Sequence, residues 1–130
     1  MQTLTLSGNE GQIDAAMLAA LKTHNLRLVN RIDGQEKAAM TGVTAGCDRI
    51  YGIFRPDYAV RVWRACPAAG IDIPLRLHVF RNEAGLLQLN YRLPGEIFSA
   101  WQNDLLNDLA DELDPLFQAL AADFAAFMND

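Results

Sequence analysis

Residues 75–93 read LRLHVFRNEAGLLQLNYRL, a run in which apolar and polar side chains alternate on both sides of a glycine. Alternation of this kind predicts two half-buried strands that form a hairpin. Side chains directly opposite each other in a hairpin share one face of the sheet. The pattern therefore pairs Leu77 with Tyr91 and Val79 with Leu89, and it directs these four side chains into the core.

The loop between the two strands is Glu83-Ala84-Gly85. A three-residue hairpin loop that ends in glycine is typical of a type I turn followed by a glycine bulge, in which the glycine is left-handed. We therefore expect a positive φ at Gly85.

The rest of the chain is predicted outward from this hairpin. Alternation predicts strands over Thr3–Ser7, Leu26–Ile32 and Arg49–Arg55, the last of which cannot continue past Pro56. Helical spacing predicts a helix over Gln12–His24, a short helical turn over Gln35–Met40 and a helix that begins at Pro56, buries Val60 and Trp63 and stops near Cys66. Beyond Pro94-Gly95 a long helix follows, kinked or restarted at Pro115, with one apolar stripe formed by Phe98, Trp101, Leu105, Leu109 and Leu113.

The order is thus strand, helix, two strands, helix, two-strand hairpin and long helix. This order predicts an α+β fold: an antiparallel sheet of five strands with helices packed on one face. The chain has 130 residues, of which 51% are hydrophobic and 21% charged, so we expect one packed domain over residues 1–130.

The face of the sheet away from the helices is predicted to be basic. Strand parity places on it six arginines and no acidic side chain: Thr3, Thr5, Ser7, Arg27, Val29, Arg31, Arg49, Tyr51, Ile53, Arg55, Arg76, His78, Phe80, Gln88, Asn90 and Arg92. The hairpin register sets Arg76 opposite Arg92, and like charges across a strand pair are destabilising unless an anion lies between them.

Three interpretations of this basic face remain open. It is a solvated surface, an interface with an acidic helix, or a site for a small anion such as a carboxylate or phosphate. The second rests on the charge distribution, because all eleven Lys and Arg residues lie at or before Arg92 while residues 96–130 hold eight carboxylates.

Several classes of function are excluded or disfavoured by the sequence. No P-loop, dinucleotide fingerprint or nucleophile elbow occurs, and His24 and His78 are too isolated to predict a metal site, so we expect neither a cofactor nor a metal. A pI near 4.9 argues against nucleic acid as a partner, although Tyr51 and Phe80 could stack on bases. The chain shows neither a signal peptide nor an apolar membrane span, and Cys47 and Cys66 suit a reduced compartment, so the cytoplasm is expected.

The middle of the chain resembles a known family. The run Arg49-Ile50-Tyr51-Gly52-Ile53-Phe54-Arg55-Pro56, the segment Pro67–Leu77, and Gly85 with Asn90-Tyr91-Arg92 look like a bacterial family catalogued as domain of unknown function three-hundred-and-two. The resemblance covers residues 26–100 and implies a small α+β domain with a sheet similar to that of the TATA-binding protein, often a homodimer. It implies no activity. Many members have Gly-Asn or Cys-Asn before the proline, whereas this chain has Phe54-Arg55, which removes a helix N-cap and a thiol.

The sequence favours binding over catalysis. The predicted site on the basic face is Arg76, His78 and Arg92, with Arg49, Tyr51 and Arg55 nearby, and its ligand is a small acidic molecule or an acidic partner surface. The alternative is an enzyme that uses His78 as a general acid or base on an anionic substrate. A homodimer in which the acidic helix neutralises the partner's sheet is also expected, and sedimentation across a salt series tests it, because an electrostatic association weakens with salt.

Overall fold

The computed structural model describes residues 1–129 and confirms the α+β class. Its five strands are β1 (Gln2–Thr5), β2 (Arg27–Asp33), β3 (Asp48–Phe54), β4 (Leu75–Arg81) and β5 (Leu87–Tyr91). They form one antiparallel sheet in the order β1-β5-β4-β3-β2. The helices are α1 (Ile13–Thr23), α2 (Gly34–Met40), α3 (Pro56–Ala65), α4 (Pro94–Phe98) and α5 (Asp104–Met128), with 3-10 turns η1 (Glu10–Gln12), η2 (Pro67–Asp72) and η3 (Ser99–Trp101).

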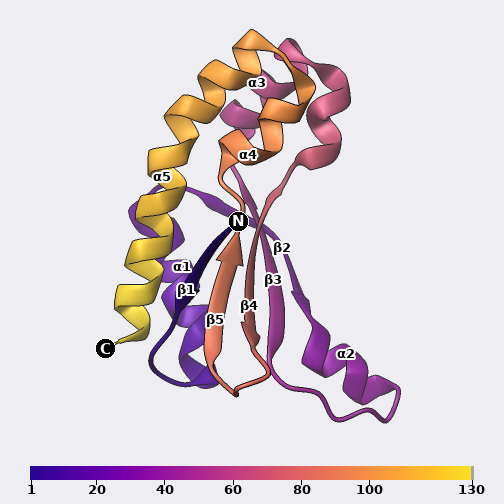
Figure 1. Ribbon diagram of the computed structural model, residues 1–130, viewed down its shortest axis with the longest axis vertical. Coiled ribbons are helices and arrows are strands. Elements are labelled where there is room, and N and C mark those ends of the chain that lie inside the picture. The colour runs from indigo at the N-terminus through magenta and orange to yellow at the C-terminus, as the bar shows by residue number, and fades with distance from the viewer. Residues whose placement is uncertain (130) are drawn as a thin grey trace.

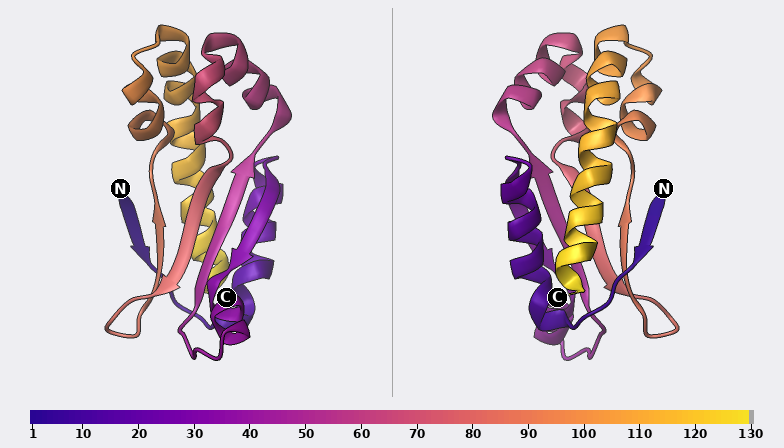
Figure 2. Two further views of the ribbon diagram at one scale, coloured as in Figure 1. Left: turned by 90° about the vertical axis from the view of Figure 1, so that its right-hand side faces the viewer. Right: turned by 90° about the vertical axis from the view of Figure 1, so that its left-hand side faces the viewer.

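The helices are distributed unevenly around the sheet. The helices α1 and α5 pack against each other and cover one face, which we call the covered face. The opposite face, the open face, has no helix lying across it in the described part of the chain (Figure 2). The helices α3 and α4 gather at one end of the sheet, and α2 projects at the other end (Figure 1). The core lies between the covered face and the two long helices.

The hairpin formed by β4 and β5 has the predicted register. Leu77 pairs with Tyr91 and Val79 with Leu89, and all four side chains are buried. Gly85 has φ +81°, the left-handed conformation expected of the glycine that ends this loop. The alternation in this segment was therefore a sufficient guide to both faces.

Strand β3 has the opposite parity from the one predicted. Arg49, Tyr51 and Ile53 pair with Val79, Leu77 and Leu75, and so they lie on the covered face. The prediction was wrong because both parities of this strand carry large apolar side chains, so alternation alone does not decide which face is buried. Arg49 instead meets carboxylates beneath the sheet, and Ile50 and Gly52 lie on the open face.

Strand β2 departs from simple alternation. Its register against β3 shifts between Leu28 and Asn30, so the chain accommodates an extra residue at Val29. A bulge of this kind moves every later side chain to the other face. Arg31, predicted on the open face, consequently lies on the covered face opposite Tyr51, while Ile32 lies on the open face and is exposed.

The two C-terminal helical segments also differ from the prediction. The chain breaks at Gln102, whose φ is +51°, and α5 restarts at the cap Asn103, whose side chain accepts a hydrogen bond from Leu106 N–H. From there α5 runs to Met128 through Pro115 without restarting. Phe98, Leu109 and Leu113 of the predicted stripe are buried, but after the break Leu106 is buried and Leu105, predicted in the core, is exposed. In α3 the buried side chain is Val62 rather than Trp63.

Candidate functional site

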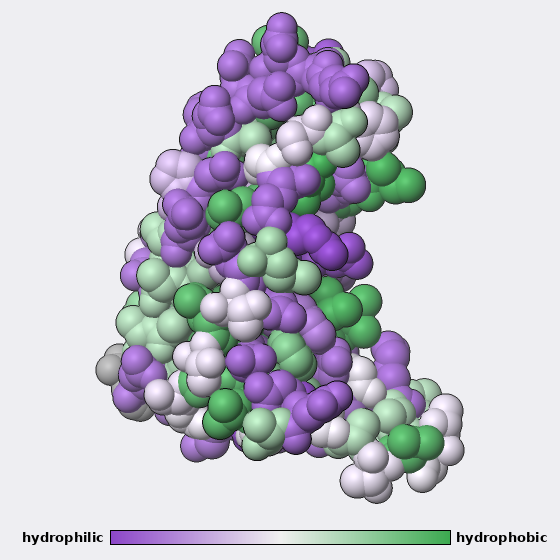
Figure 3. Space-filling view, in the orientation of Figure 1, coloured by the Kyte–Doolittle hydropathy of each residue, from purple (hydrophilic) through white to green (hydrophobic). Residues whose placement is uncertain are grey.

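A pocket of about 670 Å³ opens on the open face where the hairpin meets the helical end of the molecule. Three of the six predicted site residues, Arg76, His78 and Arg92, line it. Strand parity explains this placement, because inward-facing Leu75, Leu77 and Val79 force Arg76 and His78 outward. Figure 3 shows the outline of the molecule hollowed on this side, between the helical end and α2.

The arginines of this pocket differ from most others in the chain. Within residues 1–129, neither Arg76 nor Arg92 has a carboxylate at ion-pair distance. Five arginines elsewhere do pair with an acidic side chain: Arg31, Arg49, Arg55, Arg61 and Arg81. Since β5 ends at Tyr91, the predicted Arg76–Arg92 pair lies one residue beyond the ladder. Two unpaired guanidinium groups therefore share one pocket.

His78 is held in place by neighbours on the same face. Its Nε2 lies 3.0 Å from Asp48 Oδ1, and its ring stacks on Phe80 with the ring centroids 4.6 Å apart. The side chain is about one-third exposed. The open face therefore does contain an acid, Asp48, which the predicted list lacked because β3 has the other parity.

The carboxylates nearest the pocket are already engaged. Asp72 Oδ2 accepts a hydrogen bond from Trp101 Nε1 at 2.6 Å, and Glu96 pairs with the N-terminal amino group of Met1. Asp72 lies in the pocket wall but is at ion-pair distance from neither arginine. Among residues 1–129, the two guanidinium groups of the pocket therefore have no carboxylate paired with them.

The apolar wall of the pocket depends on a glycine in β3. A Cβ built on Gly52 would lie 2.0 Å from Asn30 Oδ1 and 2.9 Å from Pro74 Cγ. Only a residue without a side chain lets Asn30 and Pro74 close over the strand at this point. Ile50, Ile73 and Pro74 then form the apolar side of the cavity.

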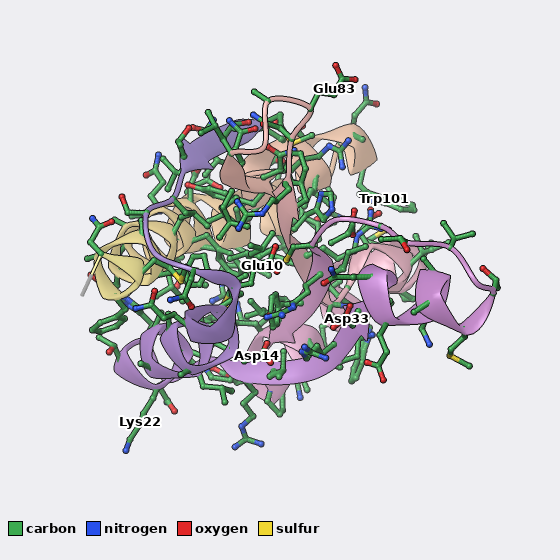
Figure 4. The ribbon with its side chains drawn as sticks, turned by 90° about the horizontal axis from the view of Figure 1, so that it is seen from below. Glu10, Asp14, Lys22, Asp33, Glu83 and Trp101 are labelled. Carbon is green, nitrogen blue, oxygen red and sulfur yellow. The ribbon has the colours of Figure 1, made fainter. Side chains whose placement is uncertain are left out.

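The other predicted site residues lie away from this pocket. Arg49 and Tyr51 belong to a cluster on the covered face, which we call the covered-face cluster: Asp14 from α1, Arg31 and Asp33 from β2, and Arg49 and Tyr51 from β3. Figure 4 shows Glu10, Asp14 and Asp33 around one region between α1 and the sheet. Arg55 precedes α3, pairs with Asp57 at 2.6 Å and lies over the Tyr58 ring, 4.2 Å from its centroid.

Asp14 is the centre of the covered-face cluster. Its Oδ1 accepts a hydrogen bond from the Tyr51 hydroxyl, lies 3.0 Å from Arg31 Nε and 3.6 Å from Arg49 Nη1. Burial alone would raise the pKa of Asp14, but the hydrogen bonds from Tyr51 and Arg31 and the two positive charges hold the pKa below its usual value. Burial and the bond to Asp14 raise the pKa of Tyr51 to about 12. These groups neutralise one another, so the cluster has the character of a structural network.

The acidic helix α5 does not reach the arginines of the pocket. It lies on the covered side of the sheet (Figure 2), and its contacts with basic residues among residues 1–129 are two: Glu112 pairs with Arg61 of α3, and Asp123 lies at ion-pair distance from His24 at the end of α1. Neutralisation of Arg76 and Arg92 by the chain's own helix is therefore absent, and neutralisation by a second subunit stays a prediction.

Metal chemistry finds no support in the described residues. Within residues 1–129, no group of three or more His, Cys, Asp or Glu side chains is arranged to hold a metal ion. His24 lies 2.6 Å from Asp123, far from His78 in the fold, and both thiols are free, Cys47 buried and Cys66 partly buried. Among the same residues, none of the helices combines the length and apolar composition needed to cross a bilayer.

Comparison with known proteins places this chain in a family. The family model described as "Domain of unknown function DUF302" matches residues 2–124. The chain belongs to the DUF302 family. The resemblance predicted over residues 26–100 is thus confirmed over almost the whole chain.

One DUF302 protein of known structure has the same fold. It is described as "uncharacterized conserved protein DUF302 from Bacillus stearothermophilus", and it matches with a TM-score of 0.81 and 18% identity over 95% of this chain and 94% of that chain. At this identity the likeness shows the fold alone. No protein with a curated description matches this DUF302 chain.

Several residues of the pocket in this DUF302 protein were missed from the sequence. Asn30 and Ile50 have the parity that was predicted to face the core, and Ile73 and Pro74 lie outside the predicted strands. Gly52 was the available signal, because a glycine in the interior of a strand marks a place where another group approaches closely. The loop residues had no periodicity that could have placed them.

Proposed function

We propose that this protein is a binding module whose open-face pocket holds a small anionic ligand, with Arg76 and Arg92 binding its carboxylate or phosphate. The observation that carries the proposal is the presence of two unpaired arginines in the wall of one pocket of about 670 Å³. A guanidinium binds a carboxylate or phosphate through two parallel hydrogen bonds. A volume of this size is typical of small-molecule sites.

The electrostatics of the pocket favour an anion. Arg76 and Arg92 flank the last pair of the hairpin ladder, so their like charges repel unless an anion lies between them. Asp72, which accepts a hydrogen bond from Trp101, and Glu96, which pairs with the N-terminus, form no ion pair with either arginine. A bound carboxylate or phosphate would relieve the repulsion and gain two charge-assisted contacts.

Substitution of Arg76 by alanine tests the proposal. Loss of one charge-assisted contact, worth about 1.5–3 kcal/mol, should weaken binding of an anion by about tenfold to a hundredfold. A thermal-shift screen with phosphate, nucleotides and dicarboxylates, followed by calorimetry, measures this effect. Arg64→Ala is the matched control, because Arg64 lies on α3 outside the pocket. The affinity of this variant for each anion should stay within about twofold of the wild-type value.

The readout is the shift that each anion causes, compared within each variant. Removing Arg76 also removes repulsion, so the unliganded variant can melt higher than the wild type. If no anion raises the melting temperature of the wild type more than that of Arg76→Ala, the proposal fails.

The contact between His78 and Asp48 favours a second candidate, an enzyme acting on an anionic substrate. A carboxylate on one imidazole nitrogen fixes the tautomer and leaves the other nitrogen for proton transfer. We expect His78→Gln to retain anion binding within a few-fold under either hypothesis. Product analysis of each bound anion separates the two, since turnover by the wild type and not by His78→Gln would replace the binding module with an enzyme.

A further inference from the structure

We propose that the ligand of this pocket is an amphipathic anion, with its charged end at Arg76 and Arg92 and its apolar chain running over Pro74 into a second groove that ends at Trp63. This inference rests on the proposed function and adds the chemical class of the ligand. The charged end and the apolar end of the ligand would lie in two different cavities.

The second groove adjoins the first pocket directly. It has a volume of about 430 Å³, and Ile73 and Pro74 belong to the walls of both cavities. On the β2 side, Asn30 lines the first pocket and Val29 lines the second. A chain bound to the arginines therefore needs to cross only the Ile73-Pro74 ridge to enter the groove.

The groove is lined mainly by apolar side chains. Leu28, Val29, Phe54, Ala59 and Trp63 form most of its wall. Arg27 and Arg55 are its charged members, and the guanidinium of Arg55 already donates two hydrogen bonds to Asp57, at 2.6 and 2.9 Å. The groove thus suits an uncharged, apolar part of a ligand.

Two large apolar side chains in the groove are exposed, one of them against expectation. Trp63 is 52% exposed although helical spacing predicted it in the core, and Val29, the extra residue of the β2 bulge, is 58% exposed. Bulges commonly re-aim a side chain near a functional site. Exposed apolar residues gathered in one groove mark a surface that a ligand covers.

The ligand must join both chemistries in one molecule. A neutral apolar ligand would leave the repulsion between Arg76 and Arg92 in place, and a small anion would leave Trp63 and Val29 in water. A carboxylate or a phosphate monoester on an alkyl chain satisfies both ends. Fatty acids carry the carboxylate and alkyl phosphates the phosphate monoester, and both present anionic oxygens that a guanidinium binds, so the experiment compares the two.

A chain-length series tests the inference. The probes are acetate, hexanoate and decanoate, with ethyl, hexyl and decyl phosphate, each kept below its micelle concentration and titrated by calorimetry. Burial of apolar chain should raise the affinity about two- to fourfold for each CH₂ that enters the groove. Decanoate or decyl phosphate should also shift the wild-type tryptophan emission to the blue, and this shift should be lost in Trp63→Phe, while acetate causes none.

Variants separate the two ends of the site. Val29→Asp should flatten the dependence on chain length and leave acetate affinity within about twofold, whereas Arg76→Ala should weaken every member of a series by a similar factor. The matched control is Leu18→Asp, because Leu18 is 54% exposed on α1, away from both cavities. The affinities of this variant across the chain-length series should equal those of the wild type.

Each contrary outcome has a distinct meaning. If short anions bind in an Arg76-dependent way but affinity does not rise with chain length, the anion-binding function stands and the amphipathic ligand is wrong. If no probe binds, both proposals are wrong. If decanol binds as tightly as decanoate, or if Arg76→Ala leaves decanoate affinity unchanged, the groove binds apolar chains without the arginines and this inference is overturned.

Discussion

Leu106→Ala is expected to lower the free energy of unfolding by about 3 kcal/mol, whereas Leu105→Ala should lower it by less than about 0.5 kcal/mol. The two leucines are neighbours in α5, so helix propensity changes equally in both variants. Leu106 is fully buried and Leu105 is 63% exposed. Only the Leu106 substitution therefore leaves a cavity in the core.

Urea denaturation followed by far-UV circular dichroism measures both values under identical conditions. The reverse ranking, with Leu105→Ala the more damaging, would mean that α5 has the helical phase of the predicted stripe. Comparable losses would mean that the helix does not present one face to the sheet. A slope against urea that stays constant across the variants shows that the unfolded states are comparable.

The difference between these two residues comes from the break at Gln102. Sequence periodicity treated Phe98 to Leu113 as one helix. An unbroken helix would place Leu105 on the same buried face as Phe98. The left-handed Gln102 and the cap at Asn103 interrupt that helix and reset its phase. Caps of this kind involve one or two residues, so periodicity over a long window does not register them.

Strands were predictable to the degree that only one of their faces was apolar. In β4 and β5 one parity is wholly apolar and the other is mostly polar, and the predicted register is the observed one. In β3 both parities carry apolar residues, because Ile50 lines the pocket on one face while Tyr51 and Ile53 enter the core on the other. The β2 bulge at Val29 was beyond prediction, since nothing in the alternation marks which residue is extra.

The candidate pocket was predictable in part for the same reason. Arg76, His78 and Arg92 were found because the hairpin determines their face. Ile73 and Pro74 come from the segment before β4, whose position depends on how η2 packs at the end of the sheet. Arg49 and Tyr51 were placed on the open face by strand parity alone. The carboxylates of Asp14 and Asp33 that pair with Arg49 on the covered face come from distant parts of the sequence.

Asp14→Ala is expected to lower the free energy of unfolding by about 2 kcal/mol. The substitution removes the acceptor of the Tyr51 hydroxyl and leaves Arg31 and Arg49 with Asp33 alone, and breaking a fully buried pair costs about 3–5 kcal/mol. The expected loss is smaller because the Asp14 side chain is 48% exposed. Asp57→Ala is the matched control, since it breaks the exposed pair with Arg55 and should cost less than about 1 kcal/mol.

Asp14→Asn isolates the charge, because its amide oxygen can still accept the Tyr51 hydrogen bond. The pKa of Asp14 is lower in the folded protein than in the unfolded chain. Its ionised form therefore stabilises the fold above about pH 4, and this contribution is lost as the pH falls through the folded-state pKa. Urea denaturation at a series of pH values should show the wild type more stable than Asp14→Asn at neutral pH, with the gap closing in acid. A gap that stays constant down to about pH 3 would show that the Asp14 charge does not stabilise the covered-face cluster.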